Sequence, residues 1–152
     1  IARGGNLTVI GKEIFEFKKL VEIQPKVNQT KTQIIGGVLY IDNYGNVITN
    51  IRKKMFNDIG KGRKFRINVS RYSITKIFNK YNEITGNNSN DIRQFDGNKL
   101  AIFNSANFLE IAIYRSNLNT VGGASTLLGL EYRDPIIVDF FTESKPEFTT
   151  LQ

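Results

Sequence analysis

Short apolar runs, separated by turn residues, dominate the chain and predict a protein made mainly of β-strands. These runs are rich in β-branched and aromatic residues, which is typical of strands. Strands are expected over residues 36–42, 47–51, 64–69, 72–78, 99–104, 108–114 and 136–141. Two segments, 53–59 (closed by Gly60) and 122–130, are expected to form short helices. The pattern therefore predicts a mainly β fold, a small antiparallel β-barrel or sandwich with one or two short helices.

Polar segments at both ends of the chain indicate one domain with extensions. We expect an inter-domain segment and linker over 1–32, a β domain over 33–145 and a tail over 146–152. The 152 residues are enough for one ordinary domain. Residues 2–5 resemble the end of a helix, and the first residue is Ile1 rather than Met. We therefore expect the chain to derive from a longer or processed protein.

The composition excludes several kinds of chemistry. Cysteine is absent, which excludes disulfides, thiolate nucleophiles and cysteine-ligated metals. Histidine is also absent, which excludes the usual Ser–His and Cys–His nucleophile pairs. No apolar run approaches the roughly 20 residues that a membrane-spanning helix needs, and no signal-peptide pattern begins the chain. We expect a cytoplasmic location, no membrane partner, no metal and no cofactor.

Positive charge is concentrated in one part of the chain, whose net charge is +7. Ten Lys and Arg residues and a single acid, Asp58, lie between residues 52 and 80, interleaved with Phe65, Tyr72, Phe78 and the adjacent Tyr81. Cations beside aromatic rings suit RNA or single-stranded DNA. The alternative interpretation is a solvated face whose aromatic rings point inward, and the charge pattern alone favours this second interpretation.

Two polar turns carry the other candidate chemistry. The first, Asp42–Asn46, combines a carboxylate, an amide and an aromatic ring, and the second, Asn104–Asn107, leads into an apolar strand that carries Glu110. Each turn alone is typical of an ordinary hairpin with Asn or Asp side-chain hydrogen bonds. A glycine-rich segment, 122–126, lacks the lysine and the spacing of a phosphate-binding loop.

Together the two turns resemble the motifs of a known enzyme family. Residues 36–51, GGVLYIDNYGNVITNI, are similar to the first motif of the S-adenosylmethionine (SAM) hydroxide adenosyltransferases, which are relatives of the fluorinating and chlorinating enzymes. Residues 104–112, NSANFLEIA, resemble the second motif, and an aromatic residue, Tyr81, lies between the two as expected. The resemblance covers nearly the whole chain and identifies it as the C-terminal β domain of a two-domain α/β plus β enzyme.

The resemblance implies that this chain is part of a SAM hydrolase. In the family, hydroxide from water attacks the ribose 5′-carbon and yields adenosine and methionine. An N-terminal α/β domain, absent from this chain, supplies the Asp-Arg-His set that activates water. The implied partners are therefore SAM or adenosine, that N-terminal domain, and two further copies in a homotrimer with the site at the subunit interface. The chain alone is expected to be inactive.

The resemblance assigns substrate contacts, and no catalytic role, to eight residues of this chain: Asp42, Tyr44, Asn46, Tyr81, Asn104, Ser105, Tyr114 and Arg115. In the first motif, Asp42 would bind the methionine ammonium group. Tyr44 would line an apolar wall, and Asn46 would hydrogen-bond to adenine.

The remaining assigned residues follow the first motif in the chain. Tyr81 would stack on the adenine ring, and Ser105 would contact the methionine carboxylate. Main-chain groups around Tyr114 and Arg115 would bind the exocyclic amine of adenine. The halogenating relatives have an Arg where this chain has Ala106, so the resemblance favours a hydrolase over a halogenase.

Overall fold

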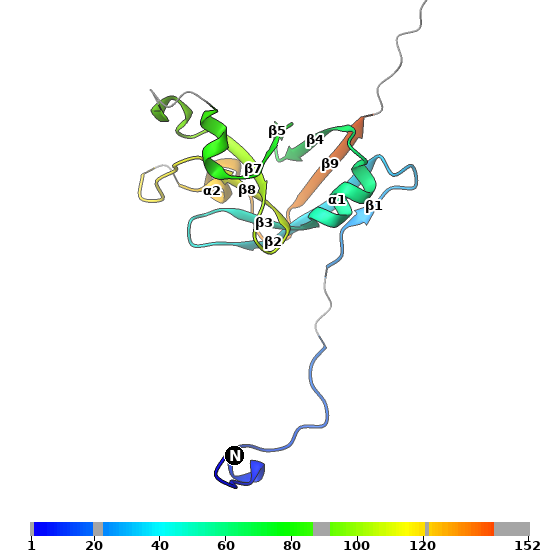
Figure 1. Ribbon diagram of the computed structural model, residues 1–152, viewed down its shortest axis with the longest axis vertical. Helices are drawn as coiled ribbons and strands as arrows, with labels where there is room; N and C mark the ends of the chain where they lie inside the picture. Colours follow the sequence, from blue (N-terminus) through cyan, green and yellow to red (C-terminus); the bar gives the residue numbers. More distant parts are fainter. Residues whose placement is uncertain (1, 20–22, 87–91, 121, 142–152) are drawn as a thin grey trace, which may run out of the picture.

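The computed structural model describes residues 2–19, 23–86, 92–120 and 122–141. After residue 25 the described chain forms a β-sheet with short helices at its sides (Figure 1). The elements are, in chain order, η1 (Leu7–Val9), β1 (Lys26–Val27), β2 (Gln33–Ile41), β3 (Val47–Arg52), α1 (Lys53–Gly60), β4 (Lys64–Val69), β5 (Tyr72–Ile74), β6 (Ile77–Phe78), η2 (Tyr81–Thr85), η3 (Ile92–Phe95), β7 (Lys99–Phe103), β8 (Phe108–Ile113), α2 (Ala124–Leu128) and β9 (Pro135–Phe141).

The strands form one nine-stranded sheet that nearly closes into a barrel, which confirms the predicted fold class. The order is β5-β4-β9-β2-β3-β8-β7-β6, with β1 paired to β2. Neighbours pair antiparallel except β6 and β7, which are parallel. The two ends of the sheet approach each other, because the Lys99 ammonium on β7 lies 4.6 Å from the centre of the Tyr72 ring on β5. This cation–π contact joins the two sides across the gap.

Both faces of the sheet bury apolar side chains. Alternate residues of a strand point to opposite faces. On β8, Leu109, Ile111 and Ile113 enter the main core inside the barrel. Ala112 and Tyr114 belong instead to a second apolar cluster on the outer face. Phe78, Ile84 and Phe95 cover that cluster, so β6, η2 and η3 form a partial layer outside the barrel.

Helix α1 closes one end of the main core through aromatic packing. Phe56 contacts three rings edge-on, with centroids 5.0 Å from Phe65, 5.4 Å from Phe103 and 5.2 Å from Phe140. The predicted helix over 53–59 is confirmed, with a correction at its end. Gly60 is the last helical residue and the left-handed cap is Lys61 (φ 49°). A Cβ at residue 60 would lie 2.6 Å from the Phe140 ring, so glycine is required there for space.

The strand predicted over 72–78 is two strands with different partners. Strand β5 pairs with β4 at one end of the sheet, and β6 pairs with β7 at the other. The chain crosses between the two ends at residues 75 and 76. The helix predicted over 122–130 is also shorter than expected, because Gly129 (φ 63°) ends α2. None of the helices in the described ranges is both long and apolar enough to cross a membrane.

Candidate functional site

The β2–β3 turn is organised by the hydrogen bonds of the Asp42 carboxylate. Asp42 Oδ1 accepts hydrogen bonds from the main-chain N–H groups of Tyr44 and Asn46, both at 2.8 Å. Its Oδ2 accepts a third from Asn46 Nδ2 at 3.0 Å. The main-chain N–H of Asp42 donates to the carbonyl of Asn46, 3.0 Å away, and Gly45 N–H donates to the carbonyl of Asp42. Asp42 therefore fixes both the path of the turn and the orientation of the Asn46 amide.

The same turn packs against the start of α2 through two glycines. Gly45 has φ 73°, a conformation that favours glycine. A Cβ on Gly123 would lie 2.5 Å from the Tyr44 carbonyl oxygen and 2.6 Å from Gly45 Cα. Ser125 N–H also donates to the Gly45 carbonyl at 2.9 Å. Segment 122–126 thus supports the Asp42–Asn46 turn, a role that the sequence did not indicate.

The outer face of the sheet continues from this turn toward the middle of β8. Tyr40 of β2 lies opposite Ile48 of β3, and Ile48 lies opposite Glu110 of β8. Glu110 in turn pairs with Ile102 of β7. These four residues form a row across the sheet. Glu110 is 8% exposed, so a carboxylate lies almost buried near the centre of this face.

Glu110 connects Tyr81 and Asn104. The Tyr81 hydroxyl donates a hydrogen bond to Glu110 Oε1, and Asn104 Nδ2 donates to Oε2 at 3.2 Å. Tyr81 begins η2, and Asn104 begins the β7–β8 turn. The structure therefore brings together two of the predicted site residues through an acid to which the resemblance gave no role.

The environment of Tyr81 keeps its hydroxyl protonated. Burial raises the pKa of Tyr81 well above its usual value near 10, and the hydrogen bond to Glu110 and the negative charges of Glu110 and Asp42 raise it further. Tyr81 thus acts as a hydrogen-bond donor, and its side chain remains about one-third exposed.

The second turn is held by Asn104 and leaves Ser105 exposed. Asn104 Oδ1 accepts from the main-chain N–H groups of Ala106 and Phe108, both at 3.1 Å. Asn107 adopts φ 62°, which Asn tolerates better than most residues. Its carbonyl accepts from Lys53 N–H at 2.8 Å, so this turn lies beside the start of α1.

The two turns lie toward opposite ends of β3 and β8. Val47 pairs with Ile111 near the first turn, and Arg52 pairs with Phe108 near the second. These pairs are three positions apart along β8, a rise of about 10 Å. Any ligand that touches both turns must therefore extend along the outer face past Glu110.

Tyr114 and Arg115 follow β8 near the first turn. The Tyr114 side chain is buried in the outer cluster. Its N–H donates to the Asn98 carbonyl at 2.8 Å, and its carbonyl accepts from Gly97 N–H at 2.9 Å. Arg115 adopts φ 48° and its guanidinium lies 3.5 Å from an Asp96 carboxylate oxygen. The predicted main-chain contact with adenine at these residues stays a prediction. Tyr44, in the first turn, has a side chain that is 74% exposed.

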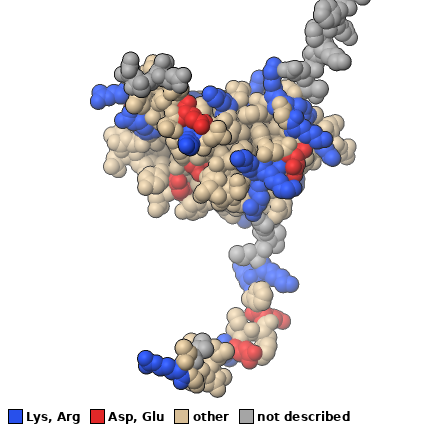
Figure 2. Space-filling model, viewed as in Figure 1, with Lys and Arg blue, Asp and Glu red and all other residues tan. Residues whose placement is uncertain are grey.

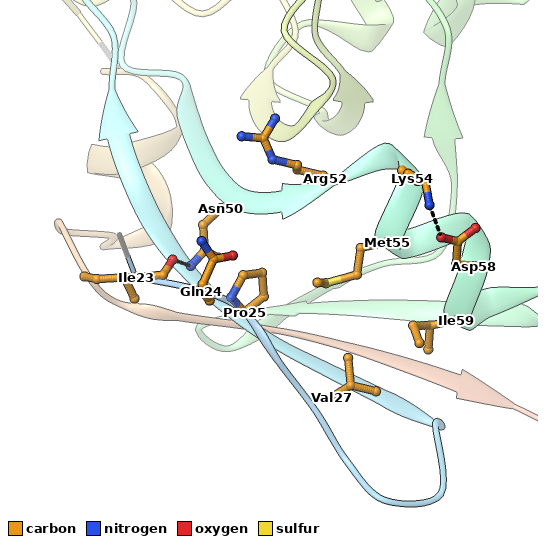
Figure 3. A pocket seen from close by; sticks show the side chains of 10 residues that line it. All are labelled: Ile23, Gln24, Pro25, Val27, Asn50, Arg52, Lys54, Met55, Asp58 and Ile59. Carbon is orange, nitrogen blue, oxygen red and sulfur yellow. Dashed lines mark hydrogen bonds and ion pairs between the residues drawn. The ribbon is translucent and has the colours of Figure 1, made fainter. Parts of the chain in front are cut away.

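A separate cavity lies on the side of the barrel where residues 23–27 join it (Figure 3). Its volume is about 390 Å³, and none of the predicted substrate-contact residues lines it. Asn50, which is 7% exposed, forms part of its wall, donating from Nδ2 to the Ile23 carbonyl at 2.7 Å and accepting from Gly37 N–H at 2.9 Å. The Lys54–Asp58 ion pair, 3.0 Å long, also lies in the lining. Asn50 ties the entering chain to the sheet.

Basic side chains gather over the region of α1 and β4 (Figure 2). The aromatic residues of the same stretch point into the protein. Phe65 packs on Phe56, Phe78 covers the outer cluster, and Tyr72 packs against the main core. This face therefore presents cations without a row of exposed rings from residues 52–80. The described ranges also contain no group of three acidic, His or Cys side chains arranged to hold a metal ion.

Comparisons with known proteins found a family profile and solved structures that match this chain. The family profile of the SAM hydroxide adenosyltransferase C-terminal domain matches residues 36–137, which include both turns. A solved structure of an uncharacterized conserved protein from Thermotoga maritima is 25% identical, with a TM-score of 0.62 over 90% of this chain and 46% of that chain. A conserved hypothetical protein from Thermus thermophilus is 20% identical, with a TM-score of 0.43 over 70% of this chain and 34% of that chain.

The chain spans less than half the length of each of these two structures. No curated protein matches it. The family profile alone covers 102 of the 152 residues, from the β2 glycines to the middle of β9. This chain belongs to the family of SAM hydroxide adenosyltransferase C-terminal domains.

Proposed function

We propose that this chain is the substrate-capping domain of an adenosine-forming SAM hydrolase. In the proposed reaction, a water oxygen forms a bond to the ribose 5′-carbon as the bond from that carbon to sulfur breaks. The sulfur leaves as the neutral thioether of methionine, and the water gives up one proton. Because the leaving group is neutral, the protein's main tasks are to align the water and to exclude other nucleophiles.

The observation that carries this proposal is the family match across both polar turns of one continuous face. The Asp42–Asn46 turn and the Tyr81–Glu110–Asn104 contacts lie along the outer side of β2, β3 and β8, and Ser105 is exposed in the turn that Asn104 begins. An extended ligand with an adenosine end and an amino-acid end fits such an elongated face. A compact ligand would contact only one of the turns.

The first turn is the proposed adenine end. Asn46 uses one N–H of its amide on Asp42. Its amide carbonyl and second N–H are then directed to the donor and acceptor edge of adenine. The Tyr81 ring would stack on the base. The Asp42 carboxylate already accepts three hydrogen bonds within the turn, so in this proposal it attracts the methionine ammonium group from a longer range.

The second turn is the proposed methionine end. Ser105, exposed beside the fixed Asn104, would donate its hydroxyl to the methionine carboxylate. Ala106 supplies no guanidinium there, so this chain would bind the carboxylate less tightly than a relative with Arg at that position.

The water-activating groups are assigned in this proposal to an N-terminal α/β domain, with the complete site at the interface of a trimer. The chain itself has no histidine. The domain therefore contributes binding and orientation, and we expect it to be inactive alone.

The test is hydrolysis of SAM by the protein that carries this domain together with its N-terminal α/β domain, in water enriched in ¹⁸O. We expect equal amounts of adenosine and methionine, with one ¹⁸O atom in the 5′-hydroxyl of adenosine. The 152-residue chain alone serves as the control without turnover. Intact SAM, or adenosine without the heavy oxygen, would refute the proposed reaction.

The alternative is a module that binds RNA or single-stranded DNA through the basic face. It is based on the concentration of ten cations in residues 52–80, without the row of exposed rings on which bases could stack. Such binding weakens steeply with added salt, whereas binding of neutral adenosine does not. Titration of a labelled oligonucleotide and of adenosine at two salt concentrations tells these functions apart.

A further inference from the structure

Glu110 is an acid in a position where acids are rarely found. Its side chain is 8% exposed and lies on a central strand between Ile48 of β3 and Ile102 of β7. A buried carboxylate is unfavourable unless hydrogen bonds compensate for the water that it loses. An apolar residue would fit this face, which already holds an apolar cluster, at lower cost. A specific need for the carboxylate is therefore expected.

The two oxygens of Glu110 bind segments from different parts of the chain. Oε1 accepts from the hydroxyl of Tyr81, which begins η2, and Oε2 accepts from Nδ2 of Asn104, which begins the β7–β8 turn. Tyr81 and Asn104 are 23 residues apart in the sequence. One carboxylate thus holds a ring of the proposed adenine site and the base of the proposed methionine site.

Both partners of Glu110 donate hydrogen bonds to it. Asn104 Oδ1 already accepts from two main-chain N–H groups, Ala106 and Phe108, so its Nδ2 must face Glu110. A glutamine at position 110 has one carbonyl oxygen and one amide nitrogen. Turned one way, its nitrogen meets the Asn104 nitrogen. Turned the other way, its nitrogen faces Tyr81, whose hydroxyl must then accept a neutral hydrogen bond instead of donating to a charged oxygen. Only a carboxylate accepts from both.

The geometry points to Glu110 as a positioning residue that fixes Tyr81 and Asn104 together, so that the substrate-binding face is formed before the substrate arrives. This inference rests on the proposed function. Glu110 does not touch the substrate in this arrangement. It acts through Tyr81, because a ring that is held in advance loses little side-chain freedom when a base stacks on it.

The test compares Glu110→Gln, Tyr81→Phe and the double variant in the hydrolase that carries both domains. Glu110→Gln and Tyr81→Phe should each weaken adenosine binding and raise the KM for SAM about 3- to 10-fold. The kcat should stay near the wild-type value, because the contact is the same in the ground and transition states. The double variant should show a much smaller effect than the product of the two single effects, because both changes alter the same hydrogen bond between residues 81 and 110. Glu131→Gln, the same chemical change at an exposed position, is the matched control.

The possible results distinguish the role of Glu110 from the proposed function of the domain. Wild-type adenosine affinity in Glu110→Gln, or effects that multiply in the double variant, would refute the role of Glu110 while leaving the proposed function intact. A wild-type protein that binds no adenosine and leaves SAM intact would refute the proposed function and this inference with it. If circular dichroism shows that Glu110→Gln does not fold, Tyr81→Phe carries the test, and unchanged affinity in that variant would overturn the inference.

Discussion

Gly123→Ala tests whether the backbone contact beneath the Asp42–Asn46 turn stabilises the domain. The added methyl group would lie 2.5 Å from the Tyr44 carbonyl oxygen and 2.6 Å from Gly45 Cα. Both atoms belong to the main chain, so no side chain can rotate away to make room. The turn and the start of α2 must separate instead, which lengthens the 2.9 Å hydrogen bond from Ser125 to Gly45.

The cost follows from steric crowding alone. Gly123 has φ −88°, which alanine adopts without strain. Overpacking a tight contact typically costs about 1–3 kcal/mol. In a domain of this size each kcal/mol lowers the melting temperature by about 3 °C, so Gly123→Ala should lower it by about 3–9 °C.

Two further glycines separate crowding from backbone strain. Gly62 has φ 76° and no atom near a new Cβ, so Gly62→Ala carries strain only, at most about 1–2 kcal/mol. Gly45→Ala carries both effects, since its Cβ would lie 2.8 Å from Gly123 Cα at φ 73°. Thermal unfolding followed by circular dichroism should rank the losses Gly45→Ala, Gly123→Ala, Gly62→Ala. A melting temperature of Gly123→Ala equal to that of wild type would refute the reasoning.

Three other predictions follow from the hydrogen bonds and the core. The raised pKa of Tyr81 favours the protonated phenol in the folded state, so the contribution of Tyr81 to stability is complete below about pH 10 and is lost as the pH rises above that value. Urea unfolding at pH 8 and pH 11 should therefore show that Tyr81→Phe loses less stability at the higher pH than the wild-type protein does. Equal losses in the two proteins would contradict this prediction. Asn50→Ala should lower stability by about 1–3 kcal/mol and speed tryptic cleavage after Lys26, whereas exposed Asn57→Ala should do neither. Ile111→Ala, at a fully buried core position, should cost about 2–5 kcal/mol in urea unfolding, and a loss near zero would mean that the core collapses around the gap.

Local sequence patterns predicted most of the strands, because each of these segments is rich in the β-branched and aromatic residues that favour strands. Residues 47–51, 64–69 and 108–114 were each predicted to within one residue of the observed β3, β4 and β8. Glycine and asparagine likewise located the β2–β3 turn, and Gly60 located the end of α1 to within one residue. The error over 72–78 has a non-local cause. The sequence reads as one continuous strand, but the two halves pair with opposite ends of the sheet.

The contacts that hold the candidate site in place could not be predicted from sequence patterns, because each contact joins segments that are distant in the sequence. Gly123 reads as part of a helix start, yet it is required by contact with Gly45. Asn50 reads as a polar residue in a strand, yet it binds the Ile23 carbonyl. Glu110 was visible as the one acid in an apolar strand, but its partners Tyr81 and Asn104 depend on the arrangement of β6, η2 and β7.

The place of β9 in the sheet bears on how the protein is made. This strand, Pro135–Phe141, lies between β4 and β2 and is hydrogen-bonded to both. A nascent chain that ends before residue 135 therefore has two unpaired strand edges where the middle of the sheet should be, and such edges favour aggregation. We expect the barrel to close only after almost all of the described chain has left the ribosome. Premature stop codons or proteolysis that remove β9 should consequently produce insoluble protein rather than a smaller folded domain.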